Sequence, residues 1–339
     1  MISVIIAAYN AEKFLAKVLD SVYEQSRLPD EIIIVDDGST DNTRKIAEEY
    51  KEEASKTFPG IRYHLIVQKN KGPAAASNVA IGNAKGEYIV SVDSDAIVDK
   101  DLIEKCVDEM EKDRSIGAVG GYIRTANKDK FWARIMGYDL EYRYDHIGGL
   151  KTPKAWMTHI SPCNTVYRKE VFDKTGGFSE TFGHTHDVDF SYRLTAAGYK
   201  ILLLKTTGCE HYCKESFSSY IRQNYKYAYG RMMLISKKAA YIKGDSVAGG
   251  PRMMMQIPLT GLGLLGLAAG MIYPTASAIG CIILAILLME RSGEAIYIVR
   301  EKKDHGMALM PFIHLLRNAA WGIACAKYVT DRLRKKITP

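Results

Sequence analysis

Short apolar runs alternate with amphipathic segments over the first third of the chain. The apolar runs are rich in β-branched residues and predict strands, at Ser3–Ala8, Glu31–Asp36, Tyr63–Val67, Tyr88–Val92 and Ile116–Tyr122. The segments between them have apolar residues at helical spacing and predict crossover helices, at Glu12–Glu24, Thr40–Tyr50, Pro73–Ala84 and Lys100–Asp113. This alternation predicts an α/β fold with a doubly wound, mixed but mainly parallel sheet.

A long stretch without charged residues runs from Met253 to Met289 and is interrupted by Tyr273-Pro274. As a helix, each half would be about as long as the hydrocarbon core of a bilayer is thick. We therefore expect a transmembrane helical hairpin over residues 253–290. The alternative is a buried helical hairpin, which would need a second core to cover it.

The segments on either side of this stretch combine apolar and basic residues. Residues 216–239 mix tyrosines with lysines and arginines, a composition typical of interfacial helices, so we expect an amphipathic helix and linker over 216–252. Residues 307–328 are apolar but contain three ionisable side chains, which are costly inside a bilayer. We expect residues 291–339 to form a basic cytosolic loop, an interfacial or membrane-spanning helix and a basic tail, after a catalytic domain at 1–215.

Charge and cysteine content narrow the possible partners and the compartment. The net charge of +7 is modest, and the basic clusters border apolar stretches instead of forming one polar stripe, which favours a membrane surface over nucleic acid. The six cysteines show no disulfide-framework spacing, which predicts reduced thiols and a cytosolic catalytic domain. The N-terminus lacks the features of a signal peptide. We therefore expect a multi-pass membrane protein.

The first candidate ligand-binding residues follow the first two predicted strands. Ala8, Tyr9 and Asn10 end the first strand, and Asp37 follows the second. Ligands of open parallel sheets bind at the carboxyl ends of the strands, because loops and helix N-termini converge there. A carboxylate at that edge can accept hydrogen bonds from ribose or a base, and Tyr9 can pack on the base. The alternative for Asp37 is helix capping.

A second group, Asp93-Ser94-Asp95, follows the fourth predicted strand. Two hard oxygen ligands beside a diphosphate suit Mg²⁺ or Mn²⁺. An isolated pair of this spacing is usually a solvated turn, but this one follows an apolar strand and falls at the same sheet edge. We predict that Asp95 binds the metal, with Asp93 and Ser94 at the nucleotide sugar.

A third group begins at His186-Asp187, where a helix is predicted to start. The Asp187 carboxylate could accept a proton from an incoming hydroxyl group, and the alternative is that it caps the helix. Asp189 and Arg193 are four residues apart and form a helix-surface pair of structural character.

In this order, the motifs resemble glycosyltransferase family 2, whose catalytic domain has the GT-A fold, over about residues 2–211. The resemblance implies that the first loops bind the nucleotide, that Asp93-Ser94-Asp95 holds the metal and that Asp187 deprotonates the acceptor. His211 matches a histidine that joins the metal or the diphosphate in that family, and its alternative role is structural.

Two departures from the family pattern concern the first loop and the region of the acceptor. Members usually have Glu-Asp in place of His186-Asp187, and often Pro in place of Ala8. A processive polysaccharide synthase would be expected to show Q-x-x-R-W, which residues 223–227 do not match. We expect inverting, metal-dependent transfer of one sugar from a nucleotide-diphosphate sugar to a lipid-linked acceptor, such as a polyprenyl phosphate or a lipid-linked saccharide.

Two other functions remain open at the level of sequence. A sugar-nucleotide nucleotidyltransferase also combines an α/β sheet with a metal, but residues 7–13 lack its glycine- and basic-rich triphosphate loop. A non-catalytic membrane scaffold is the alternative from a different class. Release of nucleotide from a sugar donor would separate these three functions.

Overall fold

The computed structural model describes residues 1–237 and 251–337 and divides the chain into two compact units. Unit 1 contains residues 1–126 and 144–212, and unit 2 contains residues 127–143 and those from 213 onward. Residues 127–143 of the predicted catalytic domain, 1–215, therefore belong to unit 2. Residues 238–250 of the predicted linker lie outside the described residues.

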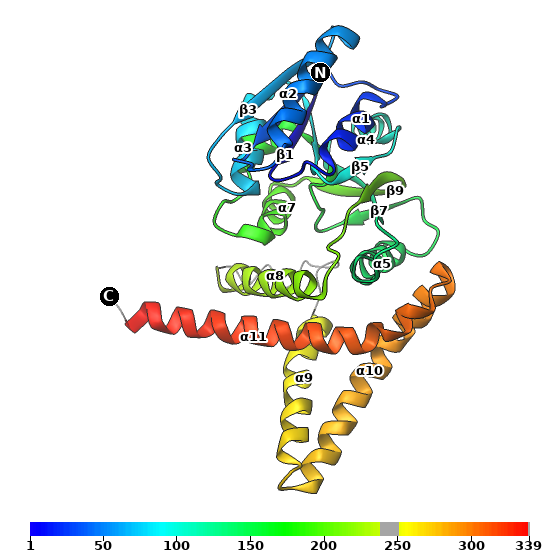
Figure 1. The fold of residues 1–339 in the computed structure, drawn as a ribbon, viewed down its shortest axis with the longest axis vertical. Coiled ribbons are helices and arrows are strands. Elements are labelled where there is room, and N and C mark those ends of the chain that lie inside the picture. The colour runs from blue at the N-terminus through cyan, green and yellow to red at the C-terminus, as the bar shows by residue number, and fades with distance from the viewer. Residues whose placement is uncertain (238–250, 338–339) are drawn as a thin grey trace. The chain divides into compact units, whose positions relative to one another are not determined.

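Unit 1 is built on one mixed sheet with the strand order β3-β2-β1-β4-β8-β6-β9-β5, and β7 pairs with β9 (Figure 1). Strands β1 to β4 are mutually parallel, whereas β8 runs antiparallel between β4 and β6. The strands are β1 Ile2–Ala8, β2 Glu31–Asp36, β3 Arg62–Val67, β4 Tyr88–Val92, β5 Ala96–Val98, β6 Ile116–Thr125, β7 Lys154–Met157, β8 Asn164–Arg168 and β9 Lys200–His211. The strands expected from the sequence match β1, β2, β3, β4 and β6.

The helices of unit 1 connect these strands and cover the sheet. Every residue of β2 and β4 is buried, as expected for strands covered on both faces. The helices are α1 Leu15–Tyr23, α2 Thr43–Thr57, α3 Pro73–Asn83, α4 Leu102–Lys112, α6 Lys169–Thr175 and α7 His186–Ala196, with a 3₁₀ turn, η1, at Gly183–Thr185. The four expected crossover helices correspond to α1 to α4.

Helices α1 and α2 begin three residues later than the sequence predicts, because the residues before them form turns. Helix α2 begins at Thr43, since the Asp41 carboxylate accepts hydrogen bonds from both the backbone N–H and the hydroxyl of Thr43. Helix α1 begins at Leu15, after Asn10 adopts a left-handed conformation with φ of 51°. Asn tolerates this region better than most residues.

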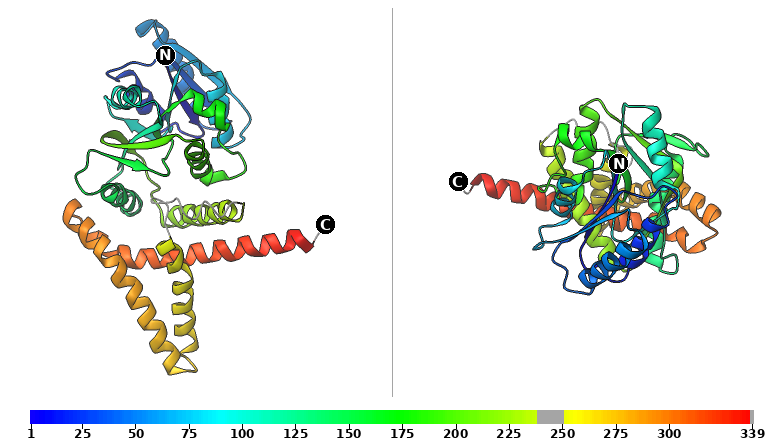
Figure 2. Two further views of the ribbon diagram at one scale, coloured as in Figure 1. Left: turned by 180° about the vertical axis from the view of Figure 1, so that it is seen from behind. Right: turned by 90° about the horizontal axis from the view of Figure 1, so that it is seen from above.

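Unit 2 is helical. It contains most of α5 Phe131–His146, together with α8 Phe217–Lys237, α9 Pro251–Ala269, α10 Pro274–Lys302, η3 His305–Leu309 and α11 Met310–Ile337. Helices α9 and α10 form a hairpin whose arms lie side by side (Figures 1 and 2). A β carbon on Gly280 would lie 2.7 Å from the carbonyl oxygen of Gly263. Glycine at the crossing therefore allows the two backbones to approach closely.

The hairpin corrects one expectation from the sequence. No helix in the described part of the chain is long and apolar enough to cross a membrane. Helix α9 has 19 residues and an internal proline, Pro258. Residues 274–289 of α10 are followed by Glu290 and Arg291, and these sixteen residues span only about 24 Å, against roughly 30 Å of hydrocarbon. The segment at 253–290 is a helical hairpin, as expected, but the prediction that it is transmembrane is not supported.

The third apolar segment, residues 307–328, occupies η3 and the first part of α11. His314 and Arg317 are 1% and 5% exposed and lie inside unit 2, near Asp139 of α5. From the sequence, this segment could be an interfacial or a membrane-spanning helix because it contains three ionisable groups. Two of these groups are buried in the protein interior. The third, Lys327, is half exposed and pairs with Asp331.

Candidate functional site

The carboxyl ends of β1, β2 and β4 lie at one edge of the sheet. Ala8 pairs with Asp36, the last residue of β2, and β4 runs parallel to β1 on its other side. Hydrogen bonds join the loops that follow β1 and β2. The Asn10 side chain accepts the N–H of Thr40 at 2.9 Å, and the Ser39 hydroxyl accepts the N–H of Asn10 at 3.0 Å. The two loops expected to open at one edge are thus tied to each other.

The residues of these loops differ in what they can offer a ligand. Tyr9 is 51% exposed, so its ring is accessible for stacking, whereas the Ala8 side chain is buried. The carboxylate of Asp37 is buried and accepts three hydrogen bonds, which come from the Gln68 side chain and from the N–H groups of Lys71 and Gly72. Asp37 therefore fixes the loop before α3, a role that neither sequence-based interpretation included.

Asp93 and Asp95 lie in the tight connection between β4 and β5, with the half-buried Ser94 between them. The N–H of Asp93 donates to the Cys163 carbonyl at 3.1 Å, beside the start of β8. Strand β5 pairs antiparallel with β9, which places His211 opposite Ala96. This pairing brings His211 Nε2 within 3.2 Å of Asp95 Oδ1.

Asp93, Asp95 and His211 form a candidate metal site. One ligand atom from each residue lies within 4.8 Å of the others, and all three residues are half-buried. Two carboxylates and an imidazole fit a divalent cation such as Mn²⁺ or Mg²⁺, which would take its other ligands from water and phosphate. The residues present therefore fit the metal that the sequence motif implies, including His211, for which the sequence left a structural alternative.

The charges at this site influence one another. The pKa of the Asp93 carboxyl is raised to about 6, first by burial and then by the Asp95 and Asp187 carboxylates, while His211 and His186 oppose the shift. A pKa raised by crowding of like charges is typical of functional sites. The interaction with Asp187 also places this carboxylate within electrostatic reach of Asp93.

Asp187 occupies the first turn of α7, as the sequence predicts, and its partner is His159. His159 Nε2 lies 2.9 Å from Asp187 Oδ2, and the two side chains are 11% and 18% exposed. Burial favours a higher pKa for the Asp187 carboxyl, but the charge and hydrogen bond of His159, with the adjacent His186, outweigh it and hold the pKa below its ordinary value. Asp187 is therefore ionised at neutral pH.

The neighbouring Asp189 has a structural environment. It is buried and accepts a hydrogen bond from Arg193 Nε at 2.8 Å. The other nitrogens of Arg193 donate to the carbonyl groups of Thr175 and Gly177. This pair fastens α7 to the loop after α6, as the four-residue spacing indicated.

His159 is the residue of the site that the sequence analysis missed. It belongs to the connection between β7 and β8, and no motif surrounds it. Ile160 donates its N–H to the Ser191 hydroxyl of α7, which anchors this connection beside Asp187. The only sequence signal would have been a histidine just before an apolar strand, which is usually a structural residue.

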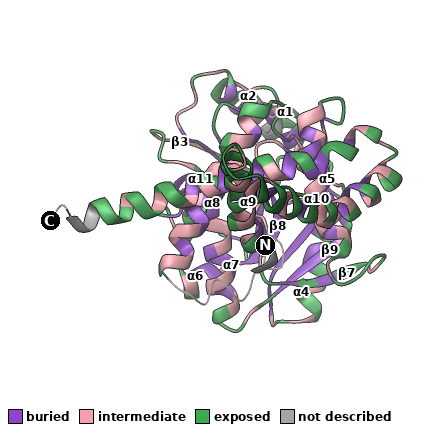
Figure 3. Ribbon diagram, turned by 90° about the horizontal axis from the view of Figure 1, so that it is seen from below, coloured by how far each residue is buried: buried purple, intermediate pink, exposed green. Residues whose placement is uncertain are grey.

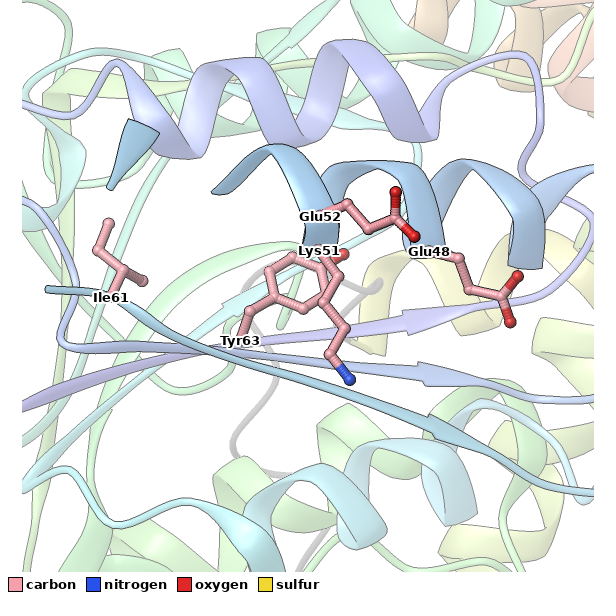
Figure 4. A pocket seen from close by; sticks show the side chains of 5 residues that line it. All are labelled: Glu48, Lys51, Glu52, Ile61 and Tyr63. Atoms are coloured by element: carbon pink, nitrogen blue, oxygen red, sulfur yellow. The ribbon is translucent and has the colours of Figure 1, made fainter. Parts of the chain in front are cut away.

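A separate pocket of about 500 Å³ lies between α2 and β3 and is not part of this site (Figure 4). Charged residues of α2 and Tyr63 of β3 line it. None of its lining residues belongs to the loops at the carboxyl ends of β1, β2 and β4.

An α/β sheet with one reversed central strand, an acidic pair after β4 and a carboxylate on a facing helix together define a GT-A type of glycosyltransferase domain. The family model "Glycosyl transferase family 2" matches residues 3–176, slightly more than half of the chain. The chain therefore belongs to glycosyl transferase family 2, as the sequence motifs indicated.

Similar proteins with assigned functions include polysaccharide synthases. Chondroitin synthase of Escherichia coli is 31% identical over 198 residues, which are 58% of this chain and 27% of that protein. Poly-beta-1,6-N-acetyl-D-glucosamine synthase of Staphylococcus aureus (strain COL) is 28% identical over 229 residues, which are 68% of this chain and 54% of that protein. The chain thus spans about a quarter to a half of the length of these relatives.

Among solved structures, the mannosyltransferase PcManGT from Pyrobaculum calidifontis, in complex with GDP-Man and Mn²⁺, is similar over 95% of this chain and 86% of its own. The identity is 20% and the TM-score is 0.58. At this identity the similarity supports the fold of the chain.

Proposed function

We propose that the protein is an inverting, metal-dependent glycosyltransferase that moves one sugar from a nucleotide-diphosphate sugar to a lipid-linked acceptor. The observation that carries the proposal is the convergence at one sheet edge of Asp93, Asp95 and His211 with the ionised carboxylate of Asp187. The first three can hold a metal at a diphosphate, and the fourth can accept a proton.

The chain's own groups have distinct roles in this reaction. The exposed ring of Tyr9 packs on the nucleotide base. The loops after β1 and β2, which Asn10 joins, lie on either side of the nucleotide. Asp95 and His211 would hold a divalent metal, which when bound would supply Lewis-acid stabilisation of the departing diphosphate. Asp187 takes the proton of the attacking acceptor hydroxyl, because its carboxylate is ionised and partly accessible.

The stereochemistry follows from the use of a single base. The acceptor oxygen attacks the anomeric carbon on the side opposite the departing nucleoside diphosphate, so one direct displacement inverts the configuration. A retaining double displacement would need a nucleophile that forms a covalent intermediate. We assign Asp187 the role of base and not that of nucleophile, and the product anomer tests this assignment.

The donor is proposed by analogy and by chemistry. PcManGT, which shares the fold, was solved with GDP-Man and Mn²⁺, and Asp93-Ser94-Asp95 is the acidic motif expected beside such a diphosphate. These points support a nucleotide-diphosphate sugar and Mn²⁺ or Mg²⁺ as the cofactor. Neither the base nor the sugar is part of the proposal.

The lipid-linked acceptor and a membrane location are proposed from the surface of the α9–α10 hairpin. Many large apolar residues of this hairpin are exposed, and much of the ribbon of α9 and α10 has the green colour of exposed residues (Figure 3). They include Met255, Leu262, Leu264, Leu265, Met271, Ile272, Tyr273, Ile279, Ile282, Ile286 and Met289. Apolar patches of this kind mark membrane or protein contacts. We propose that the hairpin enters a bilayer from its cytosolic side, where the catalytic unit also lies.

The proposal is tested by incubating the full chain with a panel of nucleotide sugars in vesicles that contain no acceptor, a lipid-linked saccharide that offers a hydroxyl group, or a polyprenyl phosphate. We expect lipid-dependent release of a nucleoside diphosphate, and its loss in excess chelator. Release of pyrophosphate from a nucleoside triphosphate and a sugar phosphate would indicate a nucleotidyltransferase. No turnover of any donor with any acceptor would favour a scaffold.

A further inference from the structure

A second group of carboxylates and a histidine lies inside unit 2. Asp139 of α5, Glu294 of α10 and His314 of α11 each place one ligand atom within 4.8 Å of the others. His314 Nε2 is 3.6 Å from Asp139 Oδ1. The three residues come from three helices, so tertiary packing and not a local motif brings them together.

The ring nitrogens of His314 and one oxygen of Glu294 are buried in this group. His314 is 1% exposed, and among the described residues neither of its ring nitrogens has a hydrogen-bond partner. Glu294 Oε1, in a side chain that is 6% exposed, has no donor among the described residues and can meet the Asp139 carboxylate only through a shared proton. Buried polar atoms in folded proteins nearly always have a partner. The convergence of these atoms therefore points to a bound group that the chain itself does not supply.

Arginines hold the outer oxygens of both carboxylates. Asp139 Oδ2 accepts a hydrogen bond from Arg143 Nη2 at 2.9 Å, and Glu294 Oε2 accepts one from Arg291 Nη1 at 2.9 Å. Arg291 is itself oriented by two hydrogen bonds to Gln256 Oε1. Outer partners of this kind fix the orientation of metal-binding carboxylates. The inner oxygens are left beside His314.

We propose that Asp139, Glu294 and His314 bind one divalent transition-metal ion, Zn²⁺ in the first place, which joins α5, α10 and α11. The ion has three protein ligands of the types that Zn²⁺ accepts, and it requires no cavity beyond the space between them. The guanidinium of Arg317, 3.7 Å from Asp139 Oδ2, adds positive charge nearby. This charge disfavours ions bound by electrostatics alone, such as Ca²⁺ or Mg²⁺, more than an ion with affinity for imidazole.

Two other occupants fit the group less well. A phosphate would meet the carboxylates of Asp139 and Glu294 at the place where it approached Arg317. A proton shared between the carboxyls is the simpler alternative, because burial and the nearby Asp139 raise the pKa of Glu294 to about 8. A proton leaves both nitrogens of His314 without a partner, whereas a metal ion satisfies one of them.

The test uses the full chain with the strand-edge site disabled by Asp95→Asn and His211→Gln. This protein is stripped of metal and titrated with Zn²⁺ and, separately, with Co²⁺, whose visible absorption reports its coordination. We expect one bound equivalent and a rise in Tm with Zn²⁺. Further substitution of His314→Gln or Glu294→Gln should weaken binding by more than the about 10- to 100-fold typical of outer partners, and abolish the rise in Tm.

The two further variants differ from their parent at one residue each, so binding to thiols or to surface groups is common to all three proteins. Circular dichroism without metal shows whether each variant is folded, and Glu294→Gln keeps the side-chain shape if His314→Gln does not fold. Absence of a bound equivalent in the parent, or equal affinity in parent and folded variant, would overturn the proposal. Either result would indicate a shared proton, and neither depends on transferase activity.

Discussion

The two carboxylate–histidine groups of this protein have similar ligands but opposite surroundings. Asp93, Asp95 and His211 lie at the edge of the sheet in unit 1, where all three are half-buried. In unit 2, Glu294 and His314 are buried, and arginines hold the outer oxygens of the carboxylates. A group that must accept a diphosphate needs open coordination positions, whereas a group that joins helices needs fixed ligands. Surroundings, more than ligand type, separate the two roles.

The largest effect is expected from Asp95→Ala, which should abolish sugar transfer. Loss of a metal ligand removes several kcal/mol of stabilisation of the leaving group. Since about 1.4 kcal/mol corresponds to a tenfold change in rate, turnover should decrease on the order of 10³-fold. Turnover and thermal unfolding are measured for Asp95→Ala and, for comparison, for Glu294→Gln. That variant should lose the stabilisation by Zn²⁺ but keep turnover per folded molecule.

Full activity of the unmutated enzyme in excess chelator would contradict the catalytic role of the strand-edge metal, whatever the Asp95 variant did. Loss of turnover in Glu294→Gln without loss of folding would break the separation between the two groups.

The next largest effect is expected from Asp187→Asn. Asn caps a helix about as well as Asp but cannot accept a proton, so turnover should fall by about 10²-fold or more while nucleotide binding persists. Asp189→Asn weakens the ion pair with Arg193 and should lower Tm more than turnover. If the Asp189 variant lost turnover and the Asp187 variant kept it, the assignment of Asp187 as the base would be wrong.

A pH-dependent effect is expected from His159→Gln. In the unmutated protein His159 holds the pKa of Asp187 low, so the base stays ionised at weakly acidic pH. Without the imidazole, burial is left to raise that pKa, and a larger fraction of Asp187 is protonated as pH falls. Turnover of the variant, measured from pH 8 to pH 5.5, should decline at a higher pH than that of the parent. Parallel profiles would leave His159 a purely structural role.

The smallest effect on activity is expected from Asp37→Asn. The carboxylate accepts two backbone N–H groups and a side-chain amide, and hydrogen bonds to charged groups contribute about 1.5–3 kcal/mol each. Asn can replace only part of this set, so the free energy of unfolding should fall by roughly 1–2 kcal/mol. Denaturant unfolding measures this change, and donor titration tests whether nucleotide affinity changes by more than the small effect of a displaced loop.

The elements closest to local rules were predictable from the sequence. Buried β-branched runs with helical segments between them predicted β1 to β4 and α1 to α4 to within a few residues, except that α2 ends seven residues later than expected. The acidic pair after β4 lies at the expected edge. Strand β9 and the partner of Asp187 were not predicted. His211 reaches Asp95 only because β5 pairs with β9, and His159 reaches Asp187 through a connection 28 residues earlier in the chain.

Unit 2 shows a different limit. Apolar composition predicted the hairpin, but it could not distinguish a helix that crosses a bilayer from one that is too short. From the sequence, the ionisable residues of α11 were expected to be unfavourable in an apolar environment, because their partners on α5 and α10 are far away in sequence. Folding brings Asp139 beside His314 and Arg317, and this pairing could not be predicted from spacing within a single helix.

The reversed direction of β8 has a consequence for how such an enzyme can diversify. Because β8 runs against β4, it begins at the edge where β4 ends, and Asn164 pairs with Val92. The segment that contains His159 therefore reaches the site before its strand begins, whereas the loops after β1 and β2 lie at the site after their strands end. Insertions or substitutions in the arriving segment can alter the surroundings of Asp187 while leaving the departing loops in place. Recognition of the two substrates can then evolve as separate traits on one sheet.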